Sequence, residues 1–562
     1  MNRGLNRLVS IATGSAVLPA VRSAVADVVG DVQQAISAIL NISGSKGLVY
    51  DKAGGTLVNG RSSTATIVDF EGLTKDVKAN EIRYSGGRRV ENLLQHTEDI
   101  SMTSYWFPSG GTVTTDTVIT TSENGSIRPT SSNSINVTIG QKFVFSFTAQ
   151  LLVGSGSFRF RESGTCTFSE LSSRPFNMLA SLNRYSVEYT ITGAGSFLPL
   201  VQSLSNDFPT FIYTKIQTEE VTGQLNQNPS EYLSSDTVYN SGLAGIACFD
   251  TENGNTVTNY VVTEAESAVI TPAPTILHEG DGTNYCFPSS TPATQIITLA
   301  AGDYTVWLDD TDDAGQIVLT GGATGTANST DTNGFQFTAS GAAVTFTHSG
   351  SNNVRWQVEG GDYRTSYIPT TTAVTRAADD ISIPLSVGTN FVQEQGAAFA
   401  RFIAQYDSDT TAKSIVSIFA GLGLIFDSST INRLSSTDGT NTANRSVTWL
   451  AGQEILVTPI WSDGESTLSL NVSLDGGIVW SGWIDATYDG AFTTGTDILL
   501  ANSNPDSIDF KSAQIYGELE GGTIATAKTW VEANAGSLTN IDVGLGDELG
   551  NTLTDEADNQ IT

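Results

Sequence analysis

The stretch KFVFSFTA, residues 142–149, is the strongest indication of how this chain folds. Phe143, Phe145 and Phe147 alternate with smaller or polar residues, so in an extended segment their side chains share one face. This alternation predicts a half-buried strand of an antiparallel sheet. Similar segments recur along the chain between turns rich in Gly, Ser, Asn and Asp: RYSVEYTIT, FIYTKIQ, QIITL, DYTVWLDD, FQFTASG and AVTFTHS. The sequence therefore predicts a mainly β protein made of tandem antiparallel β-sandwich or jelly-roll domains.

Length and composition agree with that prediction. The chain has 562 residues, 55 of them Gly, and only 15% are charged, which is typical of turn-rich β proteins. At about 100 to 200 residues per domain, three or four domains are expected. A hydrophobic content of 39% argues against general disorder.

The net charge of −32 is unevenly distributed. Residues 1–90 hold 11 Lys or Arg against 7 Asp or Glu, whereas residues 91–562 hold 16 against 52. The acidic body is expected to repel nucleic acid and anionic membranes. The apolar segment that follows Arg3 and Arg7 is interrupted by Gly14, Ser15 and Pro19, unlike a signal peptide. No stretch reaches the 18 or so apolar residues of a membrane span.

Cysteine and histidine usage gives no sign of a metal or redox centre. The three cysteines and the three histidines are widely spaced, without the close pairs of a zinc site or a disulfide framework: Cys166, Cys248, Cys286, His96, His278 and His348. We expect no cofactor. Acidic runs at 309–313 and 407–409 could supply oxygen ligands to calcium, but they lack a calcium-loop motif and are interpreted as solvated loop charge.

An N-terminal α-helix is predicted within residues 1–45. Apolar residues from Leu18 onward fall at alternating gaps of three and four, with Ala35 between the last two. They form a heptad seam of Leu18, Val21, Val25, Val28, Val32 and Ile39. β-Branched residues at both core positions of a heptad favour coiled coils of three or more helices. A homo-oligomer, with a trimer preferred, is therefore expected. The alternative is one amphipathic helix packed on its own chain or on another protein.

Two segments of the chain look like copies of one another. FIYTKIQTEEVTGQLNQNPSEYLSS at 211–235 and VRWQVEGGDYRTSYIPTTT at 354–372 both run from an alternating strand through Gln and Glu into a loop. Each loop then reaches a Ser or Thr, an aromatic residue and an extended segment. We expect Tyr232 and Tyr367 to plug the ends of two sandwich domains.

A family resemblance rests on several phrases within residues 89–380. RVENLLQHTEDIS at 89–101, followed by SYWFPSGGTVTTDT, resembles the opening of sandwich domains in virion proteins of tailed bacteriophages. WQVEGG, TSYIPTT and VTRAAD resemble the matching close, and PSEYLS with CFDTENGNTV resembles a second linker phrase. The resemblance implies a virion component such as a tail fibre or tail spike, attached to other virion proteins through its N-terminal region. It implies no catalytic residues.

The region 380–525 is expected to form a further β domain. Its strands, among them GAAFARFIAQY and STLSLNVSLDGGIVWSGW, resemble a concanavalin A-like or laminin G-like jelly roll. Because flat aromatic rings stack on sugars, Trp449, Trp480 and Trp483 are the candidate glycan-binding residues. Trp480 and Trp483 straddle Ser481-Gly482, so an extended strand would point them to opposite faces. SLDGGIVW, residues 473–480, is interpreted as a hairpin turn.

The domain organisation expected from these observations has six parts. They are a helix at 1–45, an adaptor at 46–90, a β-sandwich at 91–275, a small β-sandwich at 283–379, the jelly roll at 380–525, and an acidic tail with a short helix at 526–562. The tail is expected to be solvated or docked on a partner.

Three functions remain open at this point. The favoured one is a host-facing appendage protein in the virion that binds host-surface glycan and is not an enzyme. The second is a polysaccharide depolymerase, although no motif selects a pair of carboxylates among the 59 acidic residues. The third is a capsid decoration or head fibre without a ligand.

Overall fold

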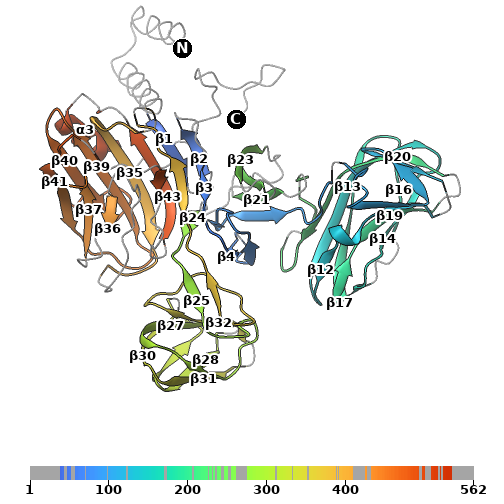
Figure 1. Ribbon diagram of the computed structural model, residues 1–562, viewed down its shortest axis with the longest axis horizontal. Helices are drawn as coiled ribbons and strands as arrows, with labels where there is room; N and C mark the ends of the chain where they lie inside the picture. Colours follow the sequence, from blue (N-terminus) through green and yellow to red (C-terminus); the bar gives the residue numbers. More distant parts are fainter. Residues whose placement is uncertain are drawn as a thin grey trace, which may run out of the picture. The chain divides into compact units, whose positions relative to one another are not determined.

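The structure is a computed structural model that describes residues 38–534 with internal gaps. The gaps are 44–46, 52–56, 70, 98, 122–123, 170–173, 205–207, 226, 231, 234–236, 242–245, 251–254, 261–274, 311–312, 332, 351–352, 388, 390, 409–423, 427–431, 491, 493–496, 500–507, 517–518 and 520–522. The described chain is mainly β, in many antiparallel sheets, as the sequence predicts (Figure 1). It divides into two compact units, one built on Leu57–Ile381 and the other on Ser382–Thr562 with the strands near residues 38–51. No helix in the described part of the chain has the length and hydropathy of a membrane span.

The first sandwich of the unit 57–381 is formed by two antiparallel sheets and a short accessory pair. One sheet has the order β15-β17-β13-β20-β10-β9, the other β16-β14-β19-β11-β8, and β12 pairs with β18. The strands and the single 3₁₀ turn are β8 (Trp106–Ser109), β9 (Gly111–Val113), β10 (Thr117–Thr120), β11 (Ser126–Pro129), η1 (Ser131–Asn133), β12 (Ile135–Val137), β13 (Lys142–Val153), β14 (Ser157–Glu162), β15 (Thr167–Phe168), β16 (Arg174–Asn177), β17 (Asn183–Gly193), β18 (Gly195–Phe197), β19 (Pro199–Ser203) and β20 (Thr210–Glu220).

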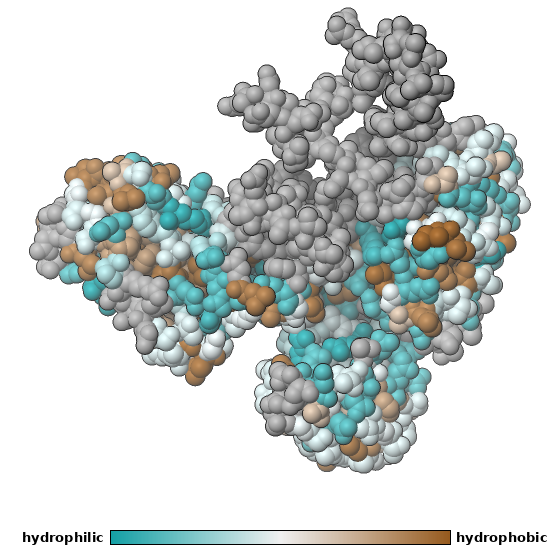
Figure 2. Space-filling view, turned by 180° about the vertical axis from the view of Figure 1, so that it is seen from behind, coloured by the Kyte–Doolittle hydropathy of each residue, from teal (hydrophilic) through white to brown (hydrophobic). Residues whose placement is uncertain are grey.

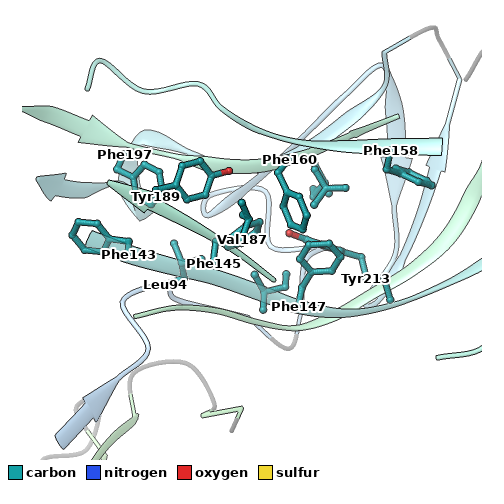
Figure 3. Packing of buried hydrophobic residues seen from close by; sticks show 14 of the residues in the cluster. Leu94, Phe143, Phe145, Phe147, Phe158, Phe160, Val187, Tyr189, Phe197 and Tyr213 are labelled. Atoms are coloured by element: carbon teal, nitrogen blue, oxygen red, sulfur yellow. The ribbon is translucent and has the colours of Figure 1, made fainter. Parts of the chain in front are cut away.

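The core of this sandwich confirms that KFVFSFTA is an antiparallel strand with its three Phe on one buried face. The strand is not half-buried as predicted, because Val144 and Ser146 on its other face are 2% and 0% exposed. Phe143, Phe145 and Phe147 of β13 are at most 1% exposed and lie in one buried aromatic cluster (Figure 3). Phe160 of the opposite sheet lies 5.7 Å from Phe147, between ring centroids, and Tyr213 lies 4.8 Å from it. The alternating strand therefore fills the space between the two sheets, where each buried ring contributes about 1.5–3 kcal/mol of transfer free energy.

A hydrogen-bonded clasp closes one end of the first sandwich. The Asn92 side chain donates from Nδ2 to Leu233 O at 3.0 Å, and Gln217 Oε1 accepts the N–H of Leu233 at 2.7 Å. The Tyr232 hydroxyl lies 2.9 Å from Thr97 Oγ1. These side chains tie the segment that leaves the sandwich to the segment that enters it.

The second sandwich carries the same clasp. Asn284 Nδ2 donates to Ile368 O at 2.9 Å, Gln357 Oε1 accepts the N–H of Ile368 at 2.7 Å, and the Tyr367 hydroxyl lies 2.8 Å from Ser289 Oγ. The similarity of segments 211–235 and 354–372, predicted from the sequence, is confirmed by these equivalent hydrogen bonds.

The two clasps differ in the length of one loop. Glu219 Oε1 accepts the N–H of Ser230 at 2.7 Å, and Glu359 Oε1 accepts the N–H of Thr365 at 3.0 Å. The loop between the paired residues is longer in the first copy. The similarity of the two segments is therefore clearer in their hydrogen bonds than in an alignment of their sequences.

The second sandwich is smaller and has its own core around Trp356 and Phe346. Its sheets have the orders β26-β31-β28-β29 and β30-β27-β32, and β25 pairs with β33. The strands are β25 (Gly282–Asn284), β26 (Gln295–Thr298), β27 (Ala301–Asp310), β28 (Gln316–Gly321), β29 (Gly325–Asn328), β30 (Phe335–Ser340), β31 (Ala343–Ser349), β32 (Asn353–Gly360) and β33 (Val374–Arg376).

The remaining strands of this unit connect the two sandwiches. Strands β21, β22 and β23, which fall within the predicted sandwich at 91–275, form a separate four-stranded sheet with β7. The strands are β3 (Val58–Asn59), β4 (Ala65–Val68), β5 (Thr74–Val77), β6 (Tyr84–Ser85), β7 (Arg88–Glu91), β21 (Thr237–Ser241), β22 (Ile246–Asp250), β23 (Asn255–Tyr260) and β24 (Thr275–His278), with β4 paired to β5 and β6 to β24.

A buried ion network joins these connecting segments. Arg83 Nη1 lies 2.7 Å from Glu279 Oε2, and Arg83 also pairs with Asp379. Arg61 Nη1 is 2.6 Å from Asp379 Oδ1, and Arg376 Nη1 is 2.7 Å from Glu279 Oε2. All five side chains are at most 2% exposed. Because a buried charge is tolerated only when it is paired, this network fixes three distant segments to one another.

Three residues of the closing phrases TSYIPTT and VTRAAD belong to this network. Ser366 donates its hydroxyl to Glu279 Oε2 at 2.6 Å, and Arg376 and Asp379 come from VTRAAD. The arginine pairing holds the pKa of Glu279 at about 2, although burial alone would raise it. These phrases therefore contribute residues to the buried ion network that holds the connecting segments together.

The second unit is a wide antiparallel sheet with a small sheet and a helix. The large sheet has the order β2-β1-β43-β35-β39-β40-β41, β36-β37-β38 form a small sheet, and β34 pairs with β42. The elements are β1 (Ala38–Ser43), β2 (Gly47–Asp51), β34 (Ile381–Pro384), β35 (Gln395–Ala404), β36 (Leu424–Phe426), β37 (Arg433–Thr437), β38 (Thr442–Ser446), β39 (Glu454–Ser462), β40 (Thr467–Ser473), β41 (Ile484–Thr487), β42 (Asp497–Leu499), β43 (Ile508–Tyr516) and α3 (Ile524–Asn534).

The N-terminal prediction is wrong where it can be compared. Ala38–Ser43, within the helix expected at 1–45, is strand β1 and pairs with the edge of β43. Ile39 falls at a shift of register in this pairing, so it is no part of a helical seam. The chain at 38–43 is rich in β-branched and other apolar residues, which suit a strand once a sheet edge is available. The other seam residues, Leu18, Val21, Val25, Val28 and Val32, lie outside the described residues.

The short helix predicted near the C-terminus is present as α3, whereas the acidic tail beyond residue 534, predicted to be solvated or docked on a partner, lies outside the described residues. Ile524, Ala527 and Val531 of α3 are at most 4% exposed and pack against Phe399 and Leu456 of the large sheet. Their spacing of three and four residues gives α3 one apolar face. The helix is therefore part of the core of this unit.

Candidate functional site

The candidate site begins at the turn that follows β40. Asp475 Oδ1 accepts the N–H of Val479 at 2.8 Å and of Ile478 at 3.1 Å, which lowers the pKa of Asp475. Gly476 and Gly477 adopt positive φ values of 76° and 95°, which a residue with a Cβ rarely does. The interpretation of SLDGGIVW as a turn is confirmed.

This turn presents apolar surface and a tryptophan. Ile478 and Val479 are 83% and 66% exposed at its tip. Trp480 follows in an isolated antiparallel bridge to Ser473 and is half-buried against the apolar cluster below α3. The Trp480 Nε1 atom is buried and has no hydrogen-bond partner among the residues that the structure describes, so the exposed part of its side chain is entirely carbon.

Trp483 is held in place by α3. Its Nε1 donates to Glu532 Oε1 at 2.7 Å, and Lys528 Nζ lies 5.3 Å from the ring centroid. Lys528 Nζ also contacts Asp485 Oδ1 at 2.6 Å. The half-buried Trp483 ring therefore has a fixed orientation between a helix and a strand.

Trp480 and Trp483 do not point to opposite faces of a strand. Residues 481–483 are irregular, Gly482 has a φ of 90°, and both rings pack on the same apolar cluster. The expectation of opposite faces failed because it assumed an extended segment. The consequence is that both rings gather on one side of the sheet.

Trp449 lies apart from this pair. It is 4% exposed, its backbone N–H donates to Ser408 Oγ at 3.0 Å, and its ring is edge-on to Tyr406, with 6.4 Å between the ring centroids. Such a buried ring offers little surface to a sugar. Whether any of the three tryptophans binds glycan stays a prediction.

The charged groups around Trp483 are already engaged with one another. Burial alone would raise the pKa of Asp485, but hydrogen bonds from Lys528 and Ser469 lower it. A carboxyl group with a lowered pKa is a poor general acid at neutral pH. The arrangement is better suited to holding aromatic surface and offering charged hydrogen-bond partners than to proton transfer.

The acidic runs considered for calcium are used by the protein itself. Asp309 pairs with Arg355 at 2.6 Å and with Arg364 at 2.8 Å, and Asp407 Oδ1 accepts the N–H of Ala451 at 2.6 Å. Within the described residues, no group of three or more His, Cys, Asp or Glu side chains is arranged to hold a metal ion.

Sequence reasoning missed the polar residues that complete the site. Asp485 comes from β41, Lys528 and Glu532 come from α3, and none belongs to a recognisable motif. The only available signal was the helical spacing of Lys528 and Glu532, which places both on one side of α3. That spacing does not reveal which strand the helix covers.

Comparisons with known proteins give no family for this chain. No protein-family model matches it, and no curated protein matches it. Among solved structures, the N-terminal CBM22-1–CBM22-2 tandem domain of Xyn10C from Paenibacillus barcinonensis is similar over 53% of this chain and 98% of that chain. The sequence identity is 13% and the TM-score is 0.16, so neither a binding residue nor a ligand is transferred from it.

Proposed function

We propose that this chain is a structural virion protein of a tailed phage, host-facing and non-enzymatic, that binds host-surface glycan through the turn carrying Trp480. The virion assignment is supported by the phrases within residues 89–380, of which TSYIPTT and VTRAAD supply Ser366, Arg376 and Asp379 of the buried ion network. A concanavalin A-like jelly roll is the fold we propose for the unit 382–534.

One observation carries the glycan-binding proposal. Trp480 and Trp483 are both half-buried on one apolar cluster, with Lys528 and Glu532 beside Trp483 and Asp485 paired to Lys528. Aromatic rings next to a few charged groups that can form hydrogen bonds are the usual elements of a carbohydrate site. Ile478, at the exposed tip of the turn, extends the apolar surface.

The test is a screen of the whole chain on an array of bacterial capsular, O-antigen and cell-wall glycans, with the W480A/W483A variant alongside. Binding of the native chain to one glycan, reduced about tenfold or more in the variant, supports the proposal. T529A, on the exposed side of α3, is the control and should bind as the native chain does. Equal binding by the native chain and W480A/W483A would contradict it.

The place of the protein on the particle needs a separate measurement. Gold-tagged antibody against residues 382–534, viewed on intact virions, should label the distal end of a tail appendage. Label spread over the head would instead identify a decoration or head-fibre protein.

A further inference from the structure

The outward face of one sheet of the first sandwich is basic, although the chain as a whole is acidic. In the sheet β16-β14-β19-β11-β8, Phe158, Phe160 and Val201 point into the core. Their neighbours along each strand therefore point outward, because successive side chains alternate between faces. Figure 1 shows β14, β16 and β19 as one layer of this sandwich.

The outward residues form two adjacent rows across four strands. Across neighbouring strands, Arg161 of β14 lies opposite Leu200 of β19, and Arg128 of β11 lies opposite Phe107 of β8. Because Ile127 lies opposite Val201, the next residue of β11, Arg128, lies beside Leu200. The first row is therefore Arg161, Leu200, Arg128 and Phe107. The second row, two residues along each strand, is Arg159, Gln202, Ser126 and Ser109. With neighbouring strands about 4.8 Å apart, each row is about 14 Å long.

Arg159 and Arg161 converge on one neutral oxygen. Arg159 Nε donates to Gln202 Oε1 at 2.7 Å, and Arg161 Nη1 donates to the same atom at 3.1 Å. Gln202 is fixed in turn, since its Nε2 donates to Asn124 O at 3.0 Å. Two like charges held side by side repel one another, and an amide oxygen neutralises neither of them. Most of the guanidinium N–H groups remain available to a ligand.

Arg128 completes the basic face beside an aromatic ring. Its guanidinium carbon lies 4.9 Å from the centroid of Phe107, which is 45% exposed. In the described part of the chain, no carboxylate lies within ion-pair distance of Arg128, Arg159 or Arg161. The adjacent Glu162 directs its carboxylate to the N–H of Gly164. Burial raises the pKa of Glu162, and the charge of Arg161 counters part of that rise without a direct ion pair.

We infer that this face, formed by Arg128, Arg159, Arg161, Gln202 and Phe107, binds a carboxylated polysaccharide such as a polyuronate. The guanidinium forks would pair with uronate carboxylates, and the Phe107 ring would lie against an apolar sugar face. The inference is independent of the site around Trp480, because it concerns a different unit and an anionic ligand.

The charge distribution favours a polysaccharide over a nucleic acid. Duplex DNA carries about one negative charge per 1.7 Å, so its charges would extend well beyond a 14 Å row onto an acidic protein. Residues 91–562 hold 52 acidic against 16 basic side chains. A polyuronate carries its charges farther apart, and at physiological salt the remaining acidic residues are screened beyond about 8 Å.

The test uses the full chain and oligogalacturonate, with binding followed by calorimetry at several salt concentrations. The native chain should bind, more weakly as salt rises, and R159Q/R161Q should bind about tenfold more weakly or worse. The matched control is K142Q/K215Q, which removes two positive charges from β13 and β20 of the other sheet of the same sandwich and should bind within about twofold of the native chain.

Three results would overturn the inference. They are no binding of oligogalacturonate by the native chain, an equal loss in both double variants, and equally tight binding of duplex DNA, which would show a general polyanion surface. Near-ultraviolet circular dichroism of R159Q/R161Q should match the native spectrum, because both side chains project from the sheet. If that spectrum changes, R128Q alone serves as the test variant, with a weakening of at least about threefold expected and unchanged binding counting against the proposal.

Discussion

Asn92 and Asn284 hold equivalent positions in two copies of one clasp. Each donates from Nδ2 to a backbone oxygen, Leu233 O at 3.0 Å and Ile368 O at 2.9 Å. Each also accepts a backbone N–H at 3.2 Å, from Thr218 in one copy and Val358 in the other. The two sandwiches therefore share a way of fixing the chain that leaves each domain.

The clasp predicts a local loss of stability when its asparagine is removed. Asn284→Ala leaves buried backbone groups without partners and should cost about 1–3 kcal/mol. Hydrogen exchange measured by mass spectrometry should rise in peptides that cover 284–289 and 357–370. Asn92→Ala is the matched control, because its effect should appear in peptides covering 92–97 and 217–233. Exchange that rises in both clasps with either variant would contradict this reading.

The buried ion network predicts a large effect for one arginine. Arg83→Met leaves Glu279 and Asp379 with a missing partner in the interior, and should lower the free energy of unfolding by about 3–5 kcal/mol. Lys142→Met removes one partner of an exposed pair, Lys142–Glu188 at 3.6 Å, and should cost no more than about 1 kcal/mol. Urea denaturation of the two variants compares them. Similar losses would show that Arg83 is not held as described.

The buried His278 should lower the free energy of unfolding in mild acid. Burial lowers the pKa of this histidine to about 4, with Asp379, Arg83, Glu279 and Arg376 facing it. Between about pH 6.5 and pH 4 the unfolded chain therefore binds a proton here that the folded chain does not. The free energy of unfolding should fall through that range, by up to about 3 kcal/mol.

The histidine contribution can be separated from that of the carboxylates. The pKa of Glu279 is about 2, so the stability due to this group is lost only as the pH falls below about 4.5 toward 2. Denaturation of the native chain and of His278→Gln at pH 7 and pH 5 should show a smaller pH dependence in the variant. Identical dependence in both proteins would exclude His278 as its source.

The helix α3 predicts a dependence on one buried valine. Val531 is fully buried against the large sheet, and Val531→Ala should destabilise the unit 382–534 by about 1–3 kcal/mol. Thr529→Ala, on the exposed side of the same helix, should stay within about 0.5 kcal/mol. Thermal unfolding followed by circular dichroism makes the comparison. A solvated tail would give no difference between the two variants.

Local pattern was sufficient for much of the fold. Phe143, Phe145 and Phe147 identify their strand because alternation is a property of the strand itself. The recurrence of Gln217 and Gln357 before a Tyr likewise revealed the repeated clasp. Partners distant in sequence were not accessible in this way. The sequence around Arg83 does not indicate that Glu279 and Asp379 are its partners. Likewise, Ala38–Ser43 forms a strand by pairing with β43, which lies far along the chain.

For the candidate site, too, local features were predictable from the sequence and contacts between distant segments were not. The turn at Asp475 was predictable from its Asp-Gly-Gly sequence, and the tryptophans were predictable as ring surface. Their grouping was not, because it depends on the positive φ of Gly482 and on α3 packing over the sheet. The basic face of the first sandwich was hidden for another reason, since its three arginines come from two strands and are masked by an overall charge of −32.

The most direct measurement for the proposed function is fluorine NMR of the chain labelled with 5-fluorotryptophan, titrated with the glycan found on the array. The chain has eight tryptophans, and single substitutions assign the resonances. The Trp480 and Trp483 resonances should move on binding, while that of Trp461, which is fully buried and donates from Nε1 to Val392 O, should stay in place. Saturating binding with no change at Trp480 and Trp483 would contradict it.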